Sequence, residues 1–289
     1  MGKFHLVELC CGSAALTMHL LFARRQVVPY QGSKWRLRRE LAAVLVERGF
    51  TELGASTLND IGPWGGAWWA LRNHPGGVAR ELRKLNNEDP RDVFDLLHGG
   101  LVPVMSVDLC FAAEFLFLQR LSHSGKAVGT KGGCWCSPGF NETSAYGVAA
   151  SERFGEIKPM IPSLISVVES MQELTWPQSV NYQMHVEDVP IFPFGLPLVI
   201  YIDPNYVNST GYPNGSMSRK QVVSVSRRLA ARCDTTVMVS EAEPIPELVE
   251  AGWEARCLRQ PPKDNKPFQT KSAEWVTLWP PSTLSLSTS

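Results

Sequence analysis

The chain has 289 residues, of which 44% are hydrophobic, and its 28 Lys and Arg residues balance 28 Asp and Glu residues. Such a chain can bury a sizeable core, and zero net charge argues against a protein that coats nucleic acid indiscriminately. It has no apolar run of about eighteen residues, and residues 1–6 hold neither a secretory nor a myristoylation signal, so we expect a soluble cytoplasmic protein. Its seven cysteines predict free thiols, and Cys134-Trp135-Cys136 lacks zinc spacing, so no metal is expected.

The N-terminal segment predicts a strand, a turn of small residues and a helix. The strand runs from His5 to Leu9, the turn from Cys10 to Ala15, and the helix from Leu16 to Ala23. Gly12 lets the backbone of the turn approach a ligand closely. Such a corner is typical of nucleotide-binding α/β folds, although a plain strand-to-helix turn has a similar sequence.

A second strand is predicted from Ala55 to Leu58, and it ends at Asn59-Asp60. A carboxylate at that position commonly binds ribose hydroxyls in dinucleotide sites, so Asp60 is a candidate. Between the two strands, Tyr30-Gln31-Gly32-Ser33-Lys34 leads into a predicted helix from Trp35 to Arg48. Apolar residues recur in that helix at intervals of three and four, which indicates one buried face.

The middle of the chain, residues 61–162, differs from its flanks. It combines glycine-rich loops with a few predicted helices, of which Leu109 to Leu121 is almost wholly apolar and therefore predicted to be buried. We interpret this segment as an insertion between the second strand and the later strands. Its loops carry aromatic, amide and cationic side chains of the kind that contact bases and phosphates. These are Lys126, Lys131, Trp135, Phe140, Asn141 and Tyr146.

Two later strands lead to the most informative motif. The first is predicted from Val180 to Val186, ahead of Glu187-Asp188, and the second from Leu198 to Ile202. The second is rich in β-branched residues and ends at Asp203-Pro204-Asn205-Tyr206, at the strand end where open α/β sheets bind ligands. A carboxylate, a rigid turn and an aromatic ring suit an exocyclic amine. The alternative is an ordinary surface turn.

The C-terminal part continues the α/β pattern. We expect a helix over 218–232, a strand over 235–240, a short helix over 247–250, a strand over 253–258 and a final edge strand over 271–278. Residues 281–289 are predicted to form a flexible tail. The 218–232 segment is basic and could supply DNA phosphate contacts, or could simply be a solvated helix face. Its basic residues are Arg219, Lys220, Arg227, Arg228 and Arg232.

Asp203-Pro204-Asn205-Tyr206 resembles the D-P-P-Y signature of DNA adenine-N6 methyltransferases, a family of Rossmann-like α/β enzymes that use S-adenosylmethionine. The resemblance implies that the Asp203 side chain and the Pro204 carbonyl accept hydrogen bonds from the target amine. It also implies that Tyr206 stacks on the extruded base. Asn205 stands where the family has a second proline, so it loosens the turn and adds an N–H donor beside the site.

The resemblance covers residues 1–60 and 180–280 and implies a cofactor site. It places Glu8 at the strand end, Gly12 under the methionine part of S-adenosylmethionine and Asp188 at the adenine amine, with Cys10 as a further candidate for the cofactor site. Tyr30 and Lys34 match the Tyr-x-Gly-x-Lys element that closes over the cofactor, although in the family this element precedes the glycine-rich strand and here it follows.

The same resemblance implies that the chain has two regions with different functions. Residues 1–60 and 163–280 would form the catalytic domain, and residues 61–162 would recognise double-stranded DNA. The candidate DNA contacts are Lys126, Lys131, Asn141, Tyr146, Tyr212, Arg219 and Lys220.

We therefore expect methyl transfer from S-adenosylmethionine to adenine N6 in DNA, in the cytoplasm of a bacterial or phage-infected cell. Three alternatives remain open. Cytosine N4 presents the same kind of amine, and an RNA or protein amide is chemically possible. Finally, because of Asn205, the chain could be a relative that binds cofactor or DNA without catalysis.

Overall fold

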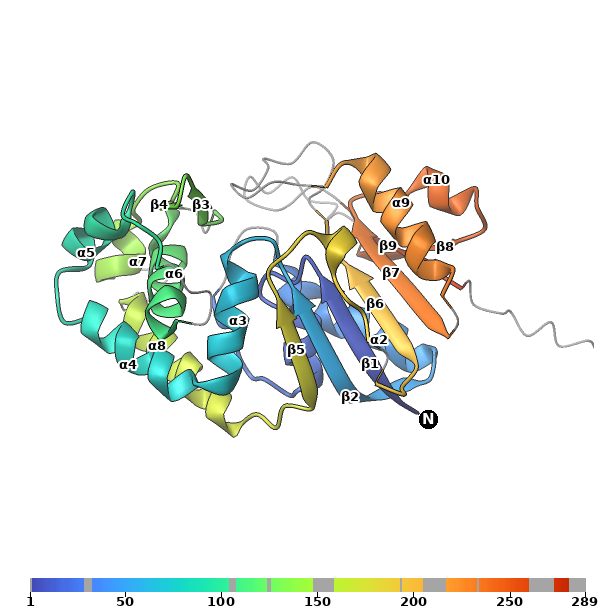
Figure 1. The fold of residues 1–289 in the computed structure, drawn as a ribbon, viewed down its shortest axis with the longest axis horizontal. Coiled ribbons are helices and arrows are strands. Elements are labelled where there is room, and N and C mark those ends of the chain that lie inside the picture. Colours follow the sequence, from blue (N-terminus) through green and yellow to red (C-terminus); the bar gives the residue numbers. More distant parts are fainter. Residues whose placement is uncertain are drawn as a thin grey trace, which may run out of the picture.

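The computed structural model describes residues 2–28, 33–103, 108–123, 126–147, 159–192, 194–204, 217–232, 234–259 and 273–280. In these residues the chain is α/β, with a seven-stranded, mostly parallel central sheet (Figure 1). The sheet strands are β1 (Gly2–Leu9), β2 (Phe50–Asn59), β5 (Gln178–Tyr182), β6 (Leu198–Ile202), β7 (Thr235–Glu241), β8 (Glu254–Arg259) and β9 (Glu274–Trp279). A separate hairpin consists of β3 (Gly129–Lys131) and β4 (Cys134–Cys136).

The described residues also form ten α-helices and several short 3-10 turns. The helices are α1 (Ala15–Leu20), α2 (Arg38–Glu47), α3 (Pro63–Asn73), α4 (Pro75–Leu85), α5 (Pro90–Leu97), α6 (Leu109–Leu121), α7 (Glu142–Tyr146), α8 (Met160–Ser170), α9 (Arg219–Ala230) and α10 (Pro246–Val249). The 3-10 turns used below are η1 (Lys34–Leu37) and η4 (Val186–Asp188).

The strand order is β5-β2-β1-β6-β7-β9-β8, with the first five strands parallel and β9 antiparallel to both of its neighbours. Along the chain, strands are first added on one side of β1, as β2 and β5, and then on its other side, as β6 and β7. The order therefore reverses between β1 and β6. In open α/β sheets the crevice outside the carboxyl ends at such a reversal is where ligands bind. This arrangement is compatible with a Rossmann-like fold.

Side chains on β1 alternate between the two faces of the sheet, as the pleat requires. Phe4 and Leu6 pack with Leu41 of α2, whereas Val7 and Leu9 pack with Val225 of α9. The sheet is therefore the middle of three layers, with α2 behind it and α9 and α10 in front (Figure 1). Fully burying side chains of this size stabilises the fold by about 1.5–3 kcal/mol each.

The chain between β2 and β5 builds a second hydrophobic core. Trp68 of α3, Val78 of α4, Phe115 of α6 and Leu164 of α8 share one buried cluster. Figure 1 shows α4 to α8 grouped on one side of the molecule, with α3 between them and the sheet. The predicted boundary at residue 162 falls inside α8, which packs on α4 and α6.

The bounds of β6 and α6 are as predicted, whereas those of the other elements differ. For example, β1 begins at Gly2 and β2 at Phe50, several residues before the predicted starts. The helix predicted from Leu16 to Ala23 ends at Leu20, because Phe22 adopts a left-handed conformation with φ of 59°. The strand predicted to reach Val186 ends at Tyr182. The predicted final edge strand is wrong in its position, since β9 hydrogen-bonds to β7 on one side and to β8 on the other.

The predicted tail, residues 281–289, lies outside the described part of the chain. None of the helices in the described ranges combines the length and apolar character that crossing a membrane requires.

Candidate functional site

The carboxyl ends of β2, β1 and β6 meet in register at one edge of the sheet. Leu9 at the end of β1 pairs with Asn59 of β2 and with Ile202 of β6. Beyond this row, the Asp203 N–H donates to the Leu9 carbonyl at 3.3 Å. The next residue of each strand, Asp60 on one side and Asp203 on the other, therefore flanks the turn that follows β1.

The turn after β1 has an unusual backbone. Cys10, Gly12 and Ala14 have φ values of 59°, 45° and 47°, in the left-handed region. Holding a residue with a side chain there costs about 1 kcal/mol or more. Two contacts fix the turn: the Gly12 N–H donates to Asp60 Oδ2 at 3.0 Å, and the Gly12 carbonyl accepts from Trp68 Nε1 at 2.7 Å.

Asp60 holds two loops together. While Oδ2 accepts from Gly12, Oδ1 accepts from the Gly62 N–H at 2.8 Å. Burial raises the pKa of this carboxyl group, and the two backbone hydrogen bonds lower it. The carboxylate predicted to bind ribose thus already positions the turn after β1.

Glu8 lies beneath the turn and caps α1. The N-cap residue Ala14 provides no side-chain hydrogen bond, and Glu8 Oε2 instead accepts from the Thr17 N–H at 2.7 Å. A carboxylate at a helix N-terminus satisfies free N–H groups and complements the helix dipole. Glu8 is almost fully buried, and this burial raises its pKa to about 7.

We expect the Glu8→Gln substitution to remove a pH-dependent loss of stability. The unfolded pKa of glutamate is about 4.3. Since the folded value is about 7, the folded state keeps a proton that the unfolded state releases, and stability falls as the pH rises through this window. The free energy of unfolding of Glu8→Gln, relative to wild type, should therefore increase by about 2–3 kcal/mol between about pH 5 and pH 7.5.

Urea unfolding at several pH values measures this difference. His5, whose pKa is lowered to about 4 by burial, gives an opposite slope, but it titrates equally in both proteins and cancels in the comparison. The control is Glu52→Gln, which alters an exposed partner of Lys3. A difference that does not change with pH would contradict the raised pKa of Glu8.

Lys34 occupies the centre of the carboxylate group. Its Nζ lies 2.9 Å from Asp203 Oδ1 and 3.4 Å from Glu274 Oε1, and all three side chains are at most 15% exposed. Burial raises the pKa of Asp203 and the Lys34 ammonium lowers it. Burial raises the pKa of Glu274 to about 7, again against the effect of Lys34. The lysine therefore favours the ionised form of both carboxyl groups.

One further carboxyl group completes a site with excess negative charge. Buried Glu241 ends β7, where Arg219 of α9 favours its ionised form. The carboxylates of the cluster are Glu8, Asp60, Asp203, Glu241 and Glu274, and the cations that act on them are Lys34 and Arg219. Even with Glu8 and Glu274 partly protonated near neutral pH, a negative excess remains among the described residues of the site. Such a site favours a cationic ligand.

The remaining predicted residues near the edge have less defined roles. Asp188 is exposed at the end of η4 and makes no contact with the carboxylate cluster within the described residues. Cys10 places its sulfur 3.9 Å from that of Met217, and Pro204 is buried. Four predicted residues lie outside the described part of the chain, namely Tyr30, Asn205, Tyr206 and Tyr212.

Of the predicted DNA contacts between residues 126 and 146, the two lysines are exposed and the other side chains are already engaged. Asn141 caps α7 by accepting from the Ser144 N–H, and the half-exposed Tyr146 donates its hydroxyl to Asp89. The prediction for Trp135 is wrong, because its ring is buried and its Nε1 donates to Glu114 at 2.8 Å. Lys126 and Lys131 are the candidates there whose side chains make no hydrogen bond or ion pair with another described residue.

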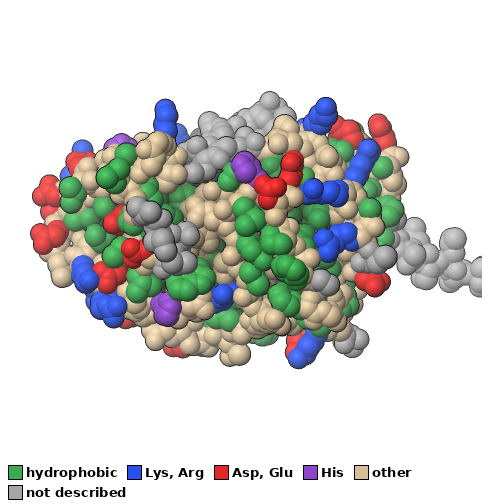
Figure 2. All heavy atoms as spheres, viewed as in Figure 1, with side chains coloured by type: hydrophobic (Ala, Val, Ile, Leu, Met, Phe, Trp, Pro, Cys, Tyr) green, Lys and Arg blue, Asp and Glu red, His purple; other side chains and the backbone are tan. Residues whose placement is uncertain are grey.

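Helix α9 places basic side chains on the face seen in Figure 2. Arg219 turns toward the acidic site, whereas Lys220 is exposed. Three other arginines of α9 and the residues after it donate to backbone carbonyl groups of neighbouring segments, including α10 and η4, as well as carrying charge. These are Arg227 to Glu247, Arg228 to Glu187 and Arg232 to Ile191.

Sequence reasoning missed Glu241 and Glu274. Glu274 is the first residue of β9, and it reaches the carboxyl ends of the parallel strands only because β9 runs in the opposite direction. It also missed a polar link behind Lys34, in which Gln26 Nε2 donates to the hydroxyls of Ser13 and Ser33. The available signal was the position of Ser13 and Ser33 directly beside Gly12 and Lys34.

No protein-family model matches the chain, and none of the curated proteins matches its sequence.

Proposed function

We propose that the protein is an S-adenosylmethionine-dependent methyltransferase that acts on adenine N6 in DNA. One observation carries the proposal. Asp203, which begins the tetrapeptide that resembles the D-P-P-Y signature, lies across the order reversal of the sheet from the left-handed turn at Gly12, and Lys34 lies 2.9 Å from its carboxylate. Gly12, Lys34 and Asp203, one described residue from each of the three motifs that suggested this family, thus lie at the same edge of the sheet although they are separated in sequence.

The charge of the site fits the proposed cofactor. S-adenosylmethionine carries a sulfonium and an ammonium group, and the cluster around Asp203 has an excess of carboxylates. The turn at Gly12 and the carboxylate of Asp60 would hold the cofactor, and Glu8 would keep the turn and α1 in place. When bound, the cofactor supplies an electrophilic methyl group on sulfur.

The protein's own contribution would be to orient and activate an aryl amine. The nitrogen lone pair of such an amine is delocalised into the ring, so the amine is a poor nucleophile. Acceptors aimed at its N–H groups favour the pyramidal nitrogen that attacks the methyl group, and they stabilise the charge that develops there. Asp203, whose ionised form Lys34 favours, and the Pro204 carbonyl would be these acceptors. Alignment of the two reactants would supply much of the rate.

Two other functions fit the same geometry. Cytosine N4 would meet the same acceptors. A protein that binds cofactor and DNA without transfer would need the same turn at Gly12. Incubating the protein with S-adenosylmethionine and unmodified DNA, and identifying the nucleosides by mass, separates the three: N6-methyladenine supports the proposal, whereas N4-methylcytosine or no modified nucleoside contradicts it.

We expect S-adenosylmethionine to bind the wild-type protein and to bind Asp60→Ala about 10–100-fold more weakly, since a hydrogen bond to a charged group contributes about 1.5–3 kcal/mol. Asp60→Ala removes the hydrogen bonds that Asp60 accepts from the Gly12 and Gly62 N–H groups. Calorimetry measures the affinity. Asp95→Ala, which removes an exposed carboxylate paired with Arg91 on α5, is the matched control and should bind as wild type does. Equal affinities of Asp60→Ala and wild type would remove Asp60 from the site.

A further inference from the structure

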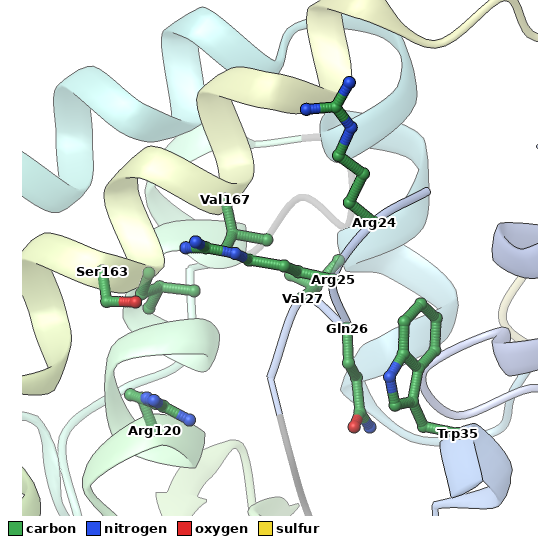
Figure 3. A pocket seen from close by; sticks show the side chains of 9 residues that line it. Arg24, Arg25, Gln26, Val27, Trp35, Arg120, Ser163 and Val167 are labelled. Atoms are coloured by element: carbon green, nitrogen blue, oxygen red, sulfur yellow. The ribbon is translucent and has the colours of Figure 1, made fainter. Parts of the chain in front are cut away.

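A cavity of about 310 Å³ lies outside the carboxylate site, between the chain that follows α1 and helices α6 and α8. Figure 3 shows Arg24, Arg25 and Trp35 on one side of it, Arg120 of α6 below and Ser163 of α8 opposite. Arg25 extends across the opening toward α8. The cavity is large enough for a small ligand or one unit of a polymer.

The cavity has a strong charge imbalance. Three arginines line it, and no acidic side chain of the described residues does so. The burial of Arg120 lowers the stability of the fold, because its Nε is buried and has no hydrogen-bond partner within the described residues. One of its terminal nitrogens faces the Met160 sulfur, at 2.9 Å, rather than a carboxylate. Guanidinium groups that converge without a counter-charge favour an anion, and their planar N–H donors match phosphate oxygens.

An exposed aromatic residue stands next to these arginines in the chain. Phe22 is 90% exposed and has φ of 59°. It ends α1 in the position where glycine is usual: the Phe22 N–H donates to the His19 carbonyl and the Ala23 N–H to the Met18 carbonyl. A bulky residue in this conformation is strained. Because the Phe22 ring is almost fully exposed, it contributes little packing that could offset the strain. Such outliers accompany function, and an aromatic ring beside cationic groups is a common arrangement for binding a nucleic acid strand.

We propose that Arg24, Arg25 and Arg120 bind a phosphate group of the DNA backbone, and that Phe22 contacts the adjoining sugar or base. This inference rests on the proposed function for the identity of the nucleic acid, and it assigns a contact outside the catalytic crevice. Gln26 connects the arginine-lined cavity to the carboxylate site. It lines the cavity, and its amide donates to Ser13 and Ser33, the neighbours of Gly12 and Lys34. A phosphate in the cavity would thus fix the DNA relative to the site.

The test compares DNA affinity and its salt dependence in wild type, in the double variant Arg24→Gln/Arg25→Gln and in Phe22→Gly. Fluorescence anisotropy with a labelled DNA duplex gives both quantities. The double variant should bind about tenfold more weakly or worse at about 0.1 M salt, and the slope of log affinity against log salt should fall by about one. Lys3→Gln is the control and should match wild type, because it changes an exposed residue near the amino-terminal end of β1.

Phe22→Gly separates a binding role from a structural one. Glycine relieves the left-handed strain, so the melting temperature should stay the same or rise, while DNA affinity falls. Unchanged DNA affinity in this variant would remove Phe22 from the contact. Inorganic phosphate and adenosine monophosphate form a second arm. If either binds the cavity arginines while the double variant keeps its DNA affinity, the cavity is a site for a free anion and the proposal is overturned.

The test also distinguishes failure of this inference from failure of the proposed function. Calorimetry with S-adenosylmethionine and nucleoside analysis at saturating DNA report on the carboxylate site alone. Methyl transfer with unchanged DNA affinity in Arg24→Gln/Arg25→Gln would overturn the phosphate contact and leave the methyltransferase proposal intact. Weakened DNA binding in that variant, without any transfer by wild type, would support the contact and contradict the enzyme.

Discussion

Replacing Asp203 by asparagine should lower the rate of methyl transfer by about 10²–10³-fold and leave the affinity for S-adenosylmethionine within about twofold of wild type. The substitution preserves the shape of the side chain but exchanges an oxygen acceptor for an NH₂ donor and removes the charge that Lys34 faces at 2.9 Å. An amine held by two acceptors is stabilised most when charge develops on its nitrogen. The loss should therefore appear in kcat rather than in ground-state binding. Single-turnover transfer and calorimetry measure the two quantities.

Glu114→Gln is the matched control for this experiment. Glu114 is also a partly buried carboxyl group with a raised pKa, but it accepts a hydrogen bond from Trp135 in the helical cluster. Its glutamine variant should transfer methyl at a rate close to that of wild type. If Asp203→Asn keeps more than about a tenth of the wild-type rate, the carboxylate is not the principal acceptor of the target amine.

Much of the sheet could be predicted from the sequence, because its strands have strong local signals. The run from Leu198 to Ile202 is entirely apolar or aromatic and is stopped by a proline, and its bounds match β6. The helix from Leu109 to Leu121 matches α6 for a similar reason, since almost every position is apolar. Asp60 and Asp203 could be placed at strand ends because a buried strand gives way to a carboxylate at both points.

The roles of the site residues depended on tertiary contacts that local patterns do not contain. Asp60 suggests a ribose ligand by its position, yet it binds the backbone of Gly12 and Gly62. Glu274 belongs to the site because β9 is antiparallel and lies between β7 and β8. Strand direction and order are set by long-range pairing, and a short apolar run such as 274–279 is equally consistent with an edge strand.

The Tyr-x-Gly-x-Lys element follows the glycine-rich strand in this chain, so its equivalence to the family's element could not be decided from order alone. Under the proposed function, the position of Lys34 beside Asp203 is the one that such an equivalence would require. Lys34 begins η1, directly before α2, and its ammonium lies between Asp203 and Glu274. The hydrogen bond from Gln26 to Ser33 helps to hold the backbone next to Lys34 in place.

Lys34→Met should have the largest combined effect on stability and activity. It leaves two buried carboxyl groups, Asp203 and Glu274, without the ammonium that both contact. Removing one partner of a buried ion pair costs about 3–5 kcal/mol, so the free energy of unfolding should fall by an amount of this order. Lys34 lowers the pKa of Asp203, so its removal raises that pKa and reduces the ionised fraction near neutral pH. Methyl transfer should therefore fall at least about a hundredfold at neutral pH.

The pH dependence identifies the cause of that loss. If Lys34 acts by keeping Asp203 ionised, the rate of Lys34→Met should recover as the pH rises through the raised pKa of Asp203, whereas the wild-type rate should change little over the same range. Lys34→Arg keeps the positive charge and should retain most of the ionisation, so its pH profile should resemble that of wild type even if its rate is lower. Loss of activity in Lys34→Met that is independent of pH, with Asp203→Asn unaffected, would place the lysine's role in cofactor closure rather than in the charge state of Asp203. Rates measured well below each variant's melting temperature keep unfolding out of the comparison.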